Sequence, residues 1–423
     1  MGKEKQILVL PGDGIGPELM AEGLKVLGAV GKKYGHKFYF VMAPFGAEAY
    51  FKHGSCFPDY TQQCVKSNNY DAVLKGPIGL DDLGTKRLKA AGVTSLEQET
   101  VIALRSPAFL DTWACYRPVV LPKEFAFFSP LRPEIIGGGI DILMMRELVG
   151  GIYFGPKEEG VSKDGTIGTY ARDDCTYTLN QTERFAELCF GEAEKRDGKL
   201  TLAHKRNVLA IGRYWEAIFD KTAKKRHPNI PFEKTLIDSF FTKFKLNPTS
   251  FNGVVAFNNL DGDYTTDDGG GVIGSLGLMP SACWNPESRK GYFEPSHGSA
   301  PDIAGKNKAN PYSMIGSVAL MLDMAFGMKQ ESDDVWSSLK KVFSQGHMTG
   351  ELVRKLTETQ RNARADDDLR RLYSAFQDID QNISKDRVRT LIAAANMRCD
   401  SDLEARIVST TQFGGMVVEN LLA

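Results

Sequence analysis

The chain contains 423 residues, of which 42% are hydrophobic and 25% are charged, as is usual for a globular protein with a sizeable core. Its 52 lysines and arginines nearly balance its 53 aspartates and glutamates, so the composition argues against nucleic acid and membranes as partners. The seven cysteines are scattered and include no Cys-x-x-Cys pair, which argues against a disulfide framework and against a zinc site.

The first residues run directly into an apolar strand pattern, and no apolar stretch approaches the roughly 20 residues that a membrane-spanning helix needs. We therefore expect reduced cysteines and a cytoplasmic location, or the mitochondrial matrix if the source is a eukaryote.

Strand and helix patterns alternate along the first part of the chain. Buried strands are expected at residues 7–10, 37–42 and 72–74, and amphipathic helices at residues 17–34 and 58–67. This alternation predicts an α/β sheet with crossover helices. Further along, the sequence predicts an apolar strand at residues 137–146 and an exposed polar loop or arm at residues 156–178. It also predicts a core helix at residues 311–328 and a charged helical region at residues 360–406.

A glycine-rich turn follows the first strand, with the sequence Leu-Pro-Gly-Asp-Gly-Ile-Gly-Pro-Glu at residues 10–18. A loop of this kind can hold a pyrophosphate at a helix N-terminus. Its spacing is Gly-x-Gly-x-Gly rather than Gly-x-Gly-x-x-Gly, and Pro17 suits the first turn of a helix. The pattern alone leaves a tight structural turn and a phosphate-binding loop open.

Two carboxylates, Asp263 and Asp267, follow an apolar stretch that begins at Gly253. If a helix begins near Asp263, their side chains lie on one face, because residues i and i+4 are neighbours there. Paired oxygen ligands suit a hard cation such as Mg²⁺. The same spacing is common on solvated helix faces, so it leaves both interpretations open.

Several longer motifs occur in the order found in one enzyme family. They are the glycine-rich turn, Tyr-Arg-Pro-Val at 116–119, Gly-Ile-Tyr-Phe-Gly at 151–155, Lys-Arg-Asn-Val-Leu at 205–209, Asn-Leu-Asp-Gly-Asp-Tyr at 259–264 and a run from Glu294 to Pro311. On these motifs the chain resembles the β-decarboxylating dehydrogenases, which include isocitrate, 3-isopropylmalate, homoisocitrate and tartrate dehydrogenases. The resemblance covers about residues 6–350 and returns at residues 409–415.

The resemblance implies an α/β fold of the isocitrate/isopropylmalate dehydrogenase type, which is not a Rossmann fold and gives the glycine-rich turn a structural role. Such proteins have a large α/β domain and a small domain whose arm clasps a twin subunit, so that a homodimer shares its active sites. The large domain is expected at residues 1–120 and 276–359, and the small domain with its arm at residues 121–275. A helical insert is expected at residues 360–405, followed by a C-terminal helix of the large domain at residues 406–423.

The insert contains a segment, residues 372–391, that resembles a degenerate EF-hand. An intact calcium loop counted from Asp380 needs glycine at its sixth position and glutamate at its twelfth. Lys385 and Leu391 stand there, so we expect no calcium site. Some algal and marine bacterial NAD-dependent isocitrate dehydrogenases carry a similar insert.

The reaction implied by the resemblance removes hydride from C2 of a small 2-hydroxy-3-carboxy acid and then CO₂ from C3. By the resemblance, Asp263, Asp267 and a partner subunit's Asp238 hold Mg²⁺ or Mn²⁺, which lowers the pKa of the substrate hydroxyl and stabilises the enolate. Lys205 is similar to the base that takes the hydroxyl proton, and Tyr153 to the acid that reprotonates the enolate carbon. The expected substrate-binding residues are Arg105, Arg117, Arg146, Lys75 and Thr100.

The predicted cofactor is NAD, because of Asp302 and Ile303. In NADP-dependent relatives this position resembles a Lys-Tyr pair that reaches for the 2′-phosphate. A carboxylate instead accepts hydrogen bonds from the ribose hydroxyls and repels a phosphate. His297 and Asn310 resemble adenine-side contacts, and Gly298 lets the backbone come close.

The sequence signals for the substrate are mixed. Residues 74–77 and 259–264 resemble bacterial isocitrate dehydrogenases, and Lys75 offers a cation to the γ-carboxylate of a hydroxy tricarboxylate. Residues 146–155 and 275–282 resemble isopropylmalate dehydrogenases, and Val101 and Ile102 could form an apolar wall.

Together with the insert, these signals lead us to predict a homodimeric NAD-dependent isocitrate dehydrogenase of the tricarboxylic acid cycle. The alternative is 3-isopropylmalate dehydrogenase or an enzyme for another 3-substituted malate. A non-catalytic regulatory subunit is a third possibility, but the full set of expected catalytic and metal residues argues against it.

Overall fold

The computed structural model describes residues 2–161, 169–352, 383–388, 390 and 407–423. A ten-stranded mixed sheet runs through the molecule in the order β2-β1-β3-β12-β11-β4-β5-β10-β8-β9, and a separate hairpin pairs β6 with β7. The strands are β1 Glu4–Leu10, β2 Lys37–Met42, β3 Ala72–Lys75, β4 Ala114–Pro122, β5 Gly139–Glu147, β6 Lys157–Val161, β7 Thr169–Asp173, β8 Leu200–His204, β9 Phe232–Leu236, β10 Gly253–Phe257, β11 Pro280–Asn285 and β12 Lys290–Pro295.

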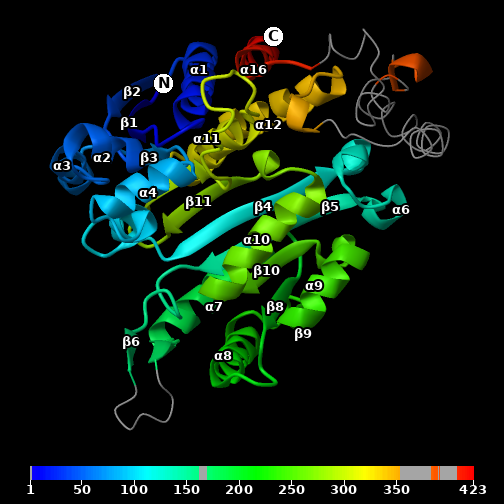
Figure 1. Ribbon diagram of the computed structural model, residues 1–423. Helices are drawn as coiled ribbons and strands as arrows, with labels where there is room; N and C mark the ends of the chain where they lie inside the picture. Colours follow the sequence, from blue (N-terminus) through cyan, green and yellow to red (C-terminus); the bar gives the residue numbers. More distant parts are fainter. Residues whose placement is uncertain (1, 162–168, 353–382, 389, 391–406) are drawn as a thin grey trace.

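The helices form two groups around this sheet (Figure 1). In the upper part of the view, α1, α11, α12 and α16 pack against one another. In the lower part, α7, α8 and α9 surround the strands β8, β9 and β10, and the long central strands β4 and β5 join the two parts. The helices are α1 Gly16–Tyr34, α2 Ala47–His53, α3 Asp59–Ser67, α4 Asp82–Ala90, α5 Ala103–Arg105, α6 Pro133–Ile136, α7 Leu179–Lys195, α8 Ala210–Arg226, α9 Ile237–Leu246, α10 Asn259–Ile273, α11 Tyr312–Met324, α12 Lys329–Ser344 and α16 Thr410–Leu422.

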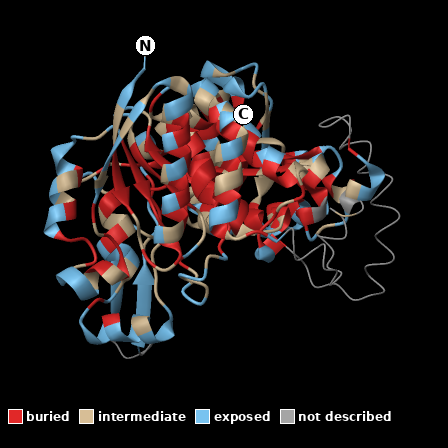
Figure 2. Ribbon diagram, turned by 90° about the horizontal axis from the view of Figure 1, so that it is seen from above, coloured by how far each residue is buried: buried red, intermediate tan, exposed pale blue. Residues whose placement is uncertain are grey.

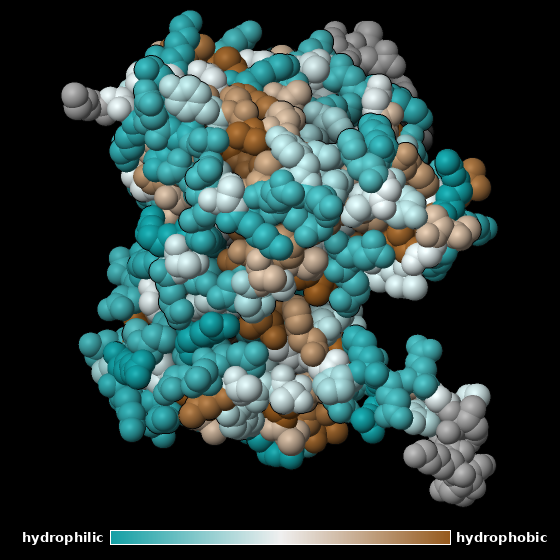
Figure 3. Space-filling view, turned by 90° about the vertical axis from the view of Figure 1, so that its left-hand side faces the viewer, coloured by the Kyte–Doolittle hydropathy of each residue, from teal (hydrophilic) through white to brown (hydrophobic). Residues whose placement is uncertain are grey.

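The predicted α/β architecture is confirmed. The strand–helix alternation at the start of the chain is present, because β1, α1, β2, α3 and β3 follow the expected order. The predicted exposed arm is a β-hairpin of β6 and β7, whose strands the polar sequence did not reveal. Figure 3 shows its hydrophilic surface projecting from the lower part of the molecule, with an indentation above it. The insert at 360–405 lies outside the described residues except for 383–388 and 390.

The core follows the central strands. All four residues of β3 are buried, as expected of a strand covered on both faces. In Figure 2 the buried residues gather in the inner strands and in the helix faces turned toward them, while the outer helix faces are exposed. Among the described residues, no helix is long and apolar enough to cross a membrane.

The glycine-rich turn between β1 and α1 packs tightly against two other loops. Gly12 has φ +73°, and a Cβ there would lie 2.1 Å from the Pro77 carbonyl oxygen, while one at Gly14 would lie 2.2 Å from the Ser299 carbonyl oxygen. The Asp13 carboxylate accepts hydrogen bonds from three backbone amides, those of Ala47, Glu48 and Gly79. Three amides of the turn, those of Asp13, Ile15 and Gly16, already donate to carbonyls. The turn therefore connects protein segments, and these three amides are not available to a phosphate.

Candidate active site

A cavity of about 440 Å³ opens at the edge of the sheet where β3, β5 and β12 end and β4 begins. Arginines, a tyrosine and carboxylates line one part of it, and apolar side chains line another. The lining includes Lys75, Ile78, Ser95, Gln98, Val101, Ile102, Arg105, Arg117, Arg146, Tyr153, Asp263, Glu294, His297 and Gly298.

The three predicted substrate arginines meet in this cavity. Arg105, Arg117 and Arg146 are all buried, and each contacts a neutral side chain. Arg117 and Arg146 also form ion pairs, with Asp267 and Asp263 respectively. Arg105 donates from Nε to the Tyr292 hydroxyl at 2.6 Å, and Arg117 donates from Nη1 to the Thr266 hydroxyl at 2.6 Å. The Nε of Arg117 is buried and has no hydrogen-bond partner among the residues that the structure describes. Three guanidinium groups that line one cavity are chemically suited to bind carboxylates.

Asn259 fixes the third arginine. Its side-chain oxygen accepts from Nε and Nη2 of Arg146 at 3.0 and 2.8 Å, and its amide nitrogen donates to the Gly150 carbonyl at 3.0 Å. Asn259 is the first residue of α10 and is fully buried. It therefore ties the end of β5 to the helix that carries the acidic residues.

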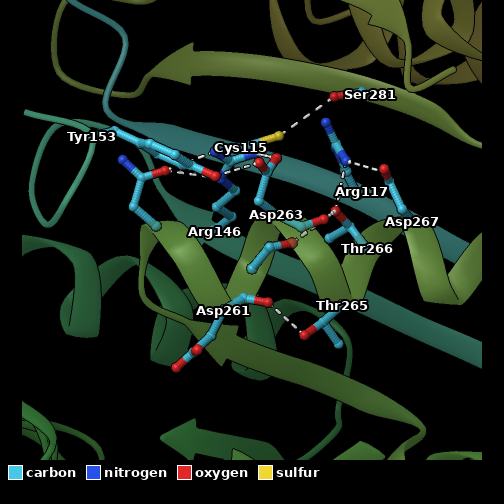
Figure 4. A network of polar contacts seen from close by, with 12 residues as sticks. Cys115, Arg117, Arg146, Tyr153, Asp261, Asp263, Thr265, Thr266, Asp267 and Ser281 are labelled. Carbon is cyan, nitrogen blue, oxygen red and sulfur yellow. Dashed lines mark hydrogen bonds and ion pairs between the residues drawn. The ribbon is translucent and has the colours of Figure 1, made fainter. Parts of the chain in front are cut away.

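Asp263 and Asp267 lie one turn apart on α10 (Figure 4). Asp263 accepts from Arg146 Nη1 and from the Tyr153 hydroxyl, the latter at 2.7 Å. Burial raises the pKa of Asp263, but the opposing effect of Arg146 and Tyr153 is larger. The pKa of this carboxyl therefore lies below its usual value, and the group stays ionised. Asp267 accepts from Arg117 Nη1 at 3.1 Å and does not line the cavity itself.

Tyr153 keeps its proton in this setting. Burial raises its pKa well above the usual value, and the hydrogen bond to Asp263 raises it further. A tyrosine that stays protonated can serve as a proton donor.

The metal-ligand set expected from the sequence is only partly assembled in one chain. Asp238, at the start of α9, is exposed and pairs with Lys205 Nζ at 3.0 Å, and neither residue lines the cavity. Among the described residues, no group of three acidic, histidine or cysteine side chains could hold a metal ion. The two carboxylates on α10 are hard oxygen donors of the kind that Mg²⁺ or Mn²⁺ takes, so they fit the cation but need a further ligand.

Lys75 lines the cavity, but its charge is already compensated. Its ammonium lies 2.5 Å from Glu294 Oε2 and donates to the Gly76 carbonyl at 2.8 Å. The Lys75 side chain is 1% exposed and that of Glu294 is 10% exposed. These contacts give Lys75 a structural partner within the chain, which its sequence position did not reveal.

The segment before Arg105 presents an apolar surface to the cavity. Val101 and Ile102 line it, together with Ile78, while Ser95 and Gln98 provide polar groups at its border. Thr100, expected to contact substrate, is buried on another side of this π-helical turn and donates its hydroxyl to the Leu96 carbonyl at 2.5 Å. The structure therefore does not bring Thr100 to the cavity, because neighbouring residues in a helix point in different directions.

The predicted cofactor residues lie in the segment that follows β12, and the first of them border the cavity. His297 and Gly298 line it, whereas Asp302 is exposed and Ile303 half-buried. Both ring nitrogens of His297 have partners, the Gly298 carbonyl at 2.8 Å and the Ser313 hydroxyl at 2.9 Å, and burial lowers its pKa, which favours the neutral ring.

Asn310 supplies an unused donor in the same segment. It is buried, and its side-chain oxygen accepts from the Tyr312 amide at 3.0 Å. Within the described part of the chain, its amide nitrogen has no hydrogen-bond partner. A buried donor without an acceptor is costly unless a ligand satisfies it, so this residue fits a nucleotide base.

Residues that hold the predicted groups in place were missed from the sequence. They are Asn259, Thr266, Tyr292 and Glu294, together with Cys115 and Cys283 beneath the arginines. Asn259 and Glu294 fall inside the recognised motifs, which was the available signal. The others reach the site by strand pairing or across helix turns, and no local pattern marks them.

Comparisons with known proteins agree with the fold. A family model described as isocitrate/isopropylmalate dehydrogenase matches residues 6–366. The 3-isopropylmalate dehydrogenase of Carboxydothermus hydrogenoformans is 39% identical over 348 residues, which cover 82% of this chain and 89% of that protein. That of Oleidesulfovibrio alaskensis is 35% identical over 353 residues, covering 83% and 94%. The crystal structure of isocitrate dehydrogenase from Methylococcus capsulatus matches with a TM-score of 0.71 at 24% identity, covering 100% of both chains, which supports the fold alone.

The prediction of an isocitrate dehydrogenase is wrong. Relatives that are 35–39% identical over most of the chain are named 3-isopropylmalate dehydrogenases, and the assignment to the tricarboxylic acid cycle falls with it. The cavity gives a physical reason, because the cation expected to meet a γ-carboxylate, Lys75, is paired with Glu294.

Proposed function

The chain belongs to the isocitrate/isopropylmalate dehydrogenase family, and we propose that it is a NAD-dependent 3-isopropylmalate dehydrogenase. The observation that carries this proposal is the division of the cavity between three arginines and an apolar wall of Val101 and Ile102. The arginines suit the two carboxylates of a malate, and the wall suits a branched alkyl group, which would gain free energy by leaving water. A third carboxylate would meet apolar side chains there and lose its hydration without a free cation.

The chemistry needs a divalent cation, and we propose Asp263 and Asp267 as its ligands in this chain. The cation would polarise the substrate hydroxyl and stabilise the enolate that decarboxylation leaves. Asp238 and Lys205 of a second copy would complete the site in a homodimer. The exposure of the Lys205–Asp238 pair and the incomplete carboxylate set on α10 support this assignment.

The proton steps would use two side chains. Lys205 would take the hydroxyl proton as hydride leaves C2, and Tyr153, whose pKa is raised, would deliver a proton to C3 after CO₂ departs. Arg105, Arg117 and Arg146 would hold the carboxylates so that the hydride on C2 faces the nicotinamide, which accepts it.

A direct assay tests the proposal. NADH formation should be measured with 3-isopropylmalate and with isocitrate, each with Mg²⁺ or Mn²⁺. We expect kcat/KM to be about 100-fold or more higher for 3-isopropylmalate, because an unpaired buried carboxylate costs several kcal/mol. A preference for isocitrate would overturn the assignment, and absence of turnover with any 3-substituted malate would revive the regulatory-subunit alternative.

Cofactor choice gives a second expected result. In the double variant Asp302→Lys, Ile303→Tyr, NADP should gain on NAD by about 100-fold in relative kcat/KM, because a cation would meet the 2′-phosphate and the ribose acceptor would be lost. Asp302→Asn is the matched control, since it removes the repulsion without adding a cation, and it should shift the ratio less. A wild-type protein that already prefers NADP would contradict the NAD assignment.

A further inference from the structure

Two buried cysteines face each other beneath the active site. Cys115 on β4 and Cys283 on β11 are direct partners in an antiparallel strand pair, and both side chains are fully buried. Directly opposed residues in such a pair have Cα atoms about 4.5–5.5 Å apart. This spacing falls within the range of about 4.4–6.8 Å that a disulfide requires. The described cysteines are all free thiols in this structure.

The pair lies on the same side of the sheet as the cavity. Cys115 precedes Arg117 by two residues on β4, and alternate residues of a strand share a face. Arg105, which lines the cavity, donates from Nη2 to Cys283 Sγ at 3.8 Å. Cys115 Sγ lies 3.4 Å from the Ser281 hydroxyl, as drawn in Figure 4. Neither cysteine lines the cavity itself, but Cys283 contacts Arg105 and Cys115 shares a strand face with Arg117, two of the groups that would bind the substrate carboxylates.

Cys115 is chemically distinct from other cysteines of the chain. A hydrogen bond from Cys283 lowers the pKa of Cys115, and Arg117, Ser281 and Arg146 add to this effect against the opposing influence of burial. Burial raises the pKa of other cysteines, such as Cys175 and Cys189. A thiol that is stabilised as its thiolate beside a second thiol is the arrangement found where reversible oxidation occurs.

We propose that Cys115 and Cys283 form a reversible disulfide when a peroxide enters the substrate cavity, and that this bond weakens substrate binding through Arg105. The Cys115 thiolate attacks one peroxide oxygen, the O–O bond breaks and hydroxide leaves, which gives a sulfenic acid. The Cys283 sulfur then attacks the Cys115 sulfur, the S–S bond forms, the S–O bond breaks, and the Cys283 proton leaves in water. In total two thiols lose two electrons, and one hydrogen peroxide becomes two waters.

The disulfide would change the support of one substrate arginine. Cys283 Sγ would move toward Cys115 and cease to accept from Arg105 Nη2, so this guanidinium would lose one of its two side-chain contacts. The guanidinium would then be held less firmly in its substrate-binding position, and we expect KM to rise by about tenfold. Bound substrate would occupy the cavity and slow the entry of peroxide.

The test uses the full-length protein treated with hydrogen peroxide, followed by peptide mass analysis without reduction. We expect a cross-linked peptide pair joining Cys115 to Cys283, slower formation in the presence of 3-isopropylmalate, and a raised KM that dithiothreitol restores. Cys115→Ser should abolish both the cross-link and the reversible change in KM. Cys175→Ser, which removes an exposed cysteine, should respond as the wild type does.

Three outcomes would overturn the proposal. The first is that the wild type forms no cross-link although Cys175 is already oxidised. The second is a cross-link that leaves KM unchanged, and the third is a Cys115→Ser variant whose KM responds to peroxide as that of the wild type does. The mass measurement does not depend on which substrate the protein turns over. A wrong proposed function and a wrong disulfide proposal can therefore be told apart.

Discussion

Replacement of Asp263 by asparagine should lower kcat/KM by about 10³-fold while the protein remains folded. The amide keeps the shape of the side chain but removes the negative charge that would hold the cation, and cation catalysis of this kind is worth several kcal/mol. Asparagine also turns an NH₂ group toward either Arg146 or Tyr153, both of which are donors to Asp263. Orientation of the proton donor should therefore suffer together with cation binding.

The measurement is a Mg²⁺ titration of the initial rate for both proteins. The variant should recover part of its activity at high Mg²⁺, because its cation affinity is reduced. Asp268→Asn is the matched control, since Asp268 lies on the same helix but pairs with Lys245 at 2.5 Å and does not line the cavity. Full activity of the Asp263→Asn variant, or of the wild type in metal-free buffer, would refute the role of Asp263.

Replacement of Lys75 by methionine should destabilise the protein by about 3–5 kcal/mol. The substitution leaves the Glu294 carboxylate buried without its cation, and removal of one partner of a buried ion pair costs about that much. Equilibrium unfolding in urea measures the effect. The double variant Lys75→Met, Glu294→Gln should regain part of the lost stability, because the unpaired charge is gone.

Lys52→Met serves as a control, because Lys52 is exposed and lies 3.8 Å from its partner Glu48. It should leave the unfolding midpoint nearly unchanged, as expected for a surface pair. If Lys75→Met also left stability unchanged and altered only the KM for substrate, Lys75 would be a binding residue, as its sequence position first indicated. The two readouts separate a structural cation from a substrate contact.

Much of the site could be predicted from the sequence because its residues occur in local motifs. Arg105, Arg117, Arg146, Tyr153 and Asp263 were expected to act together, and all five line one cavity. The strand–helix alternation predicted the α/β class, since hydrophobic periodicity is a local property. The polar composition of residues 156–178 also identified the exposed arm, although its hairpin depends on pairing between β6 and β7.

The substrate was predicted wrongly because its signals depend on what each side chain contacts. Lys75 was expected to meet a γ-carboxylate. Because β3 pairs with β12, the ammonium instead lies beside Glu294, which is 219 residues further along the chain. Thr100 was expected at the cavity, but the π-helical turn gives this wall to Val101 and Ile102.

The sequence by itself determined the fold class and the chemical types that gather at the site, because motifs and periodicity are written in neighbouring residues. Only the tertiary structure decided which charges are free and which are neutralised. It paired Lys75 with Glu294, tied Arg146 to Asn259, and placed Cys115 opposite Cys283. Each of these contacts joins residues far apart in the chain, and the free energy of a charge or thiol depends on such neighbours more than on its own position in the sequence.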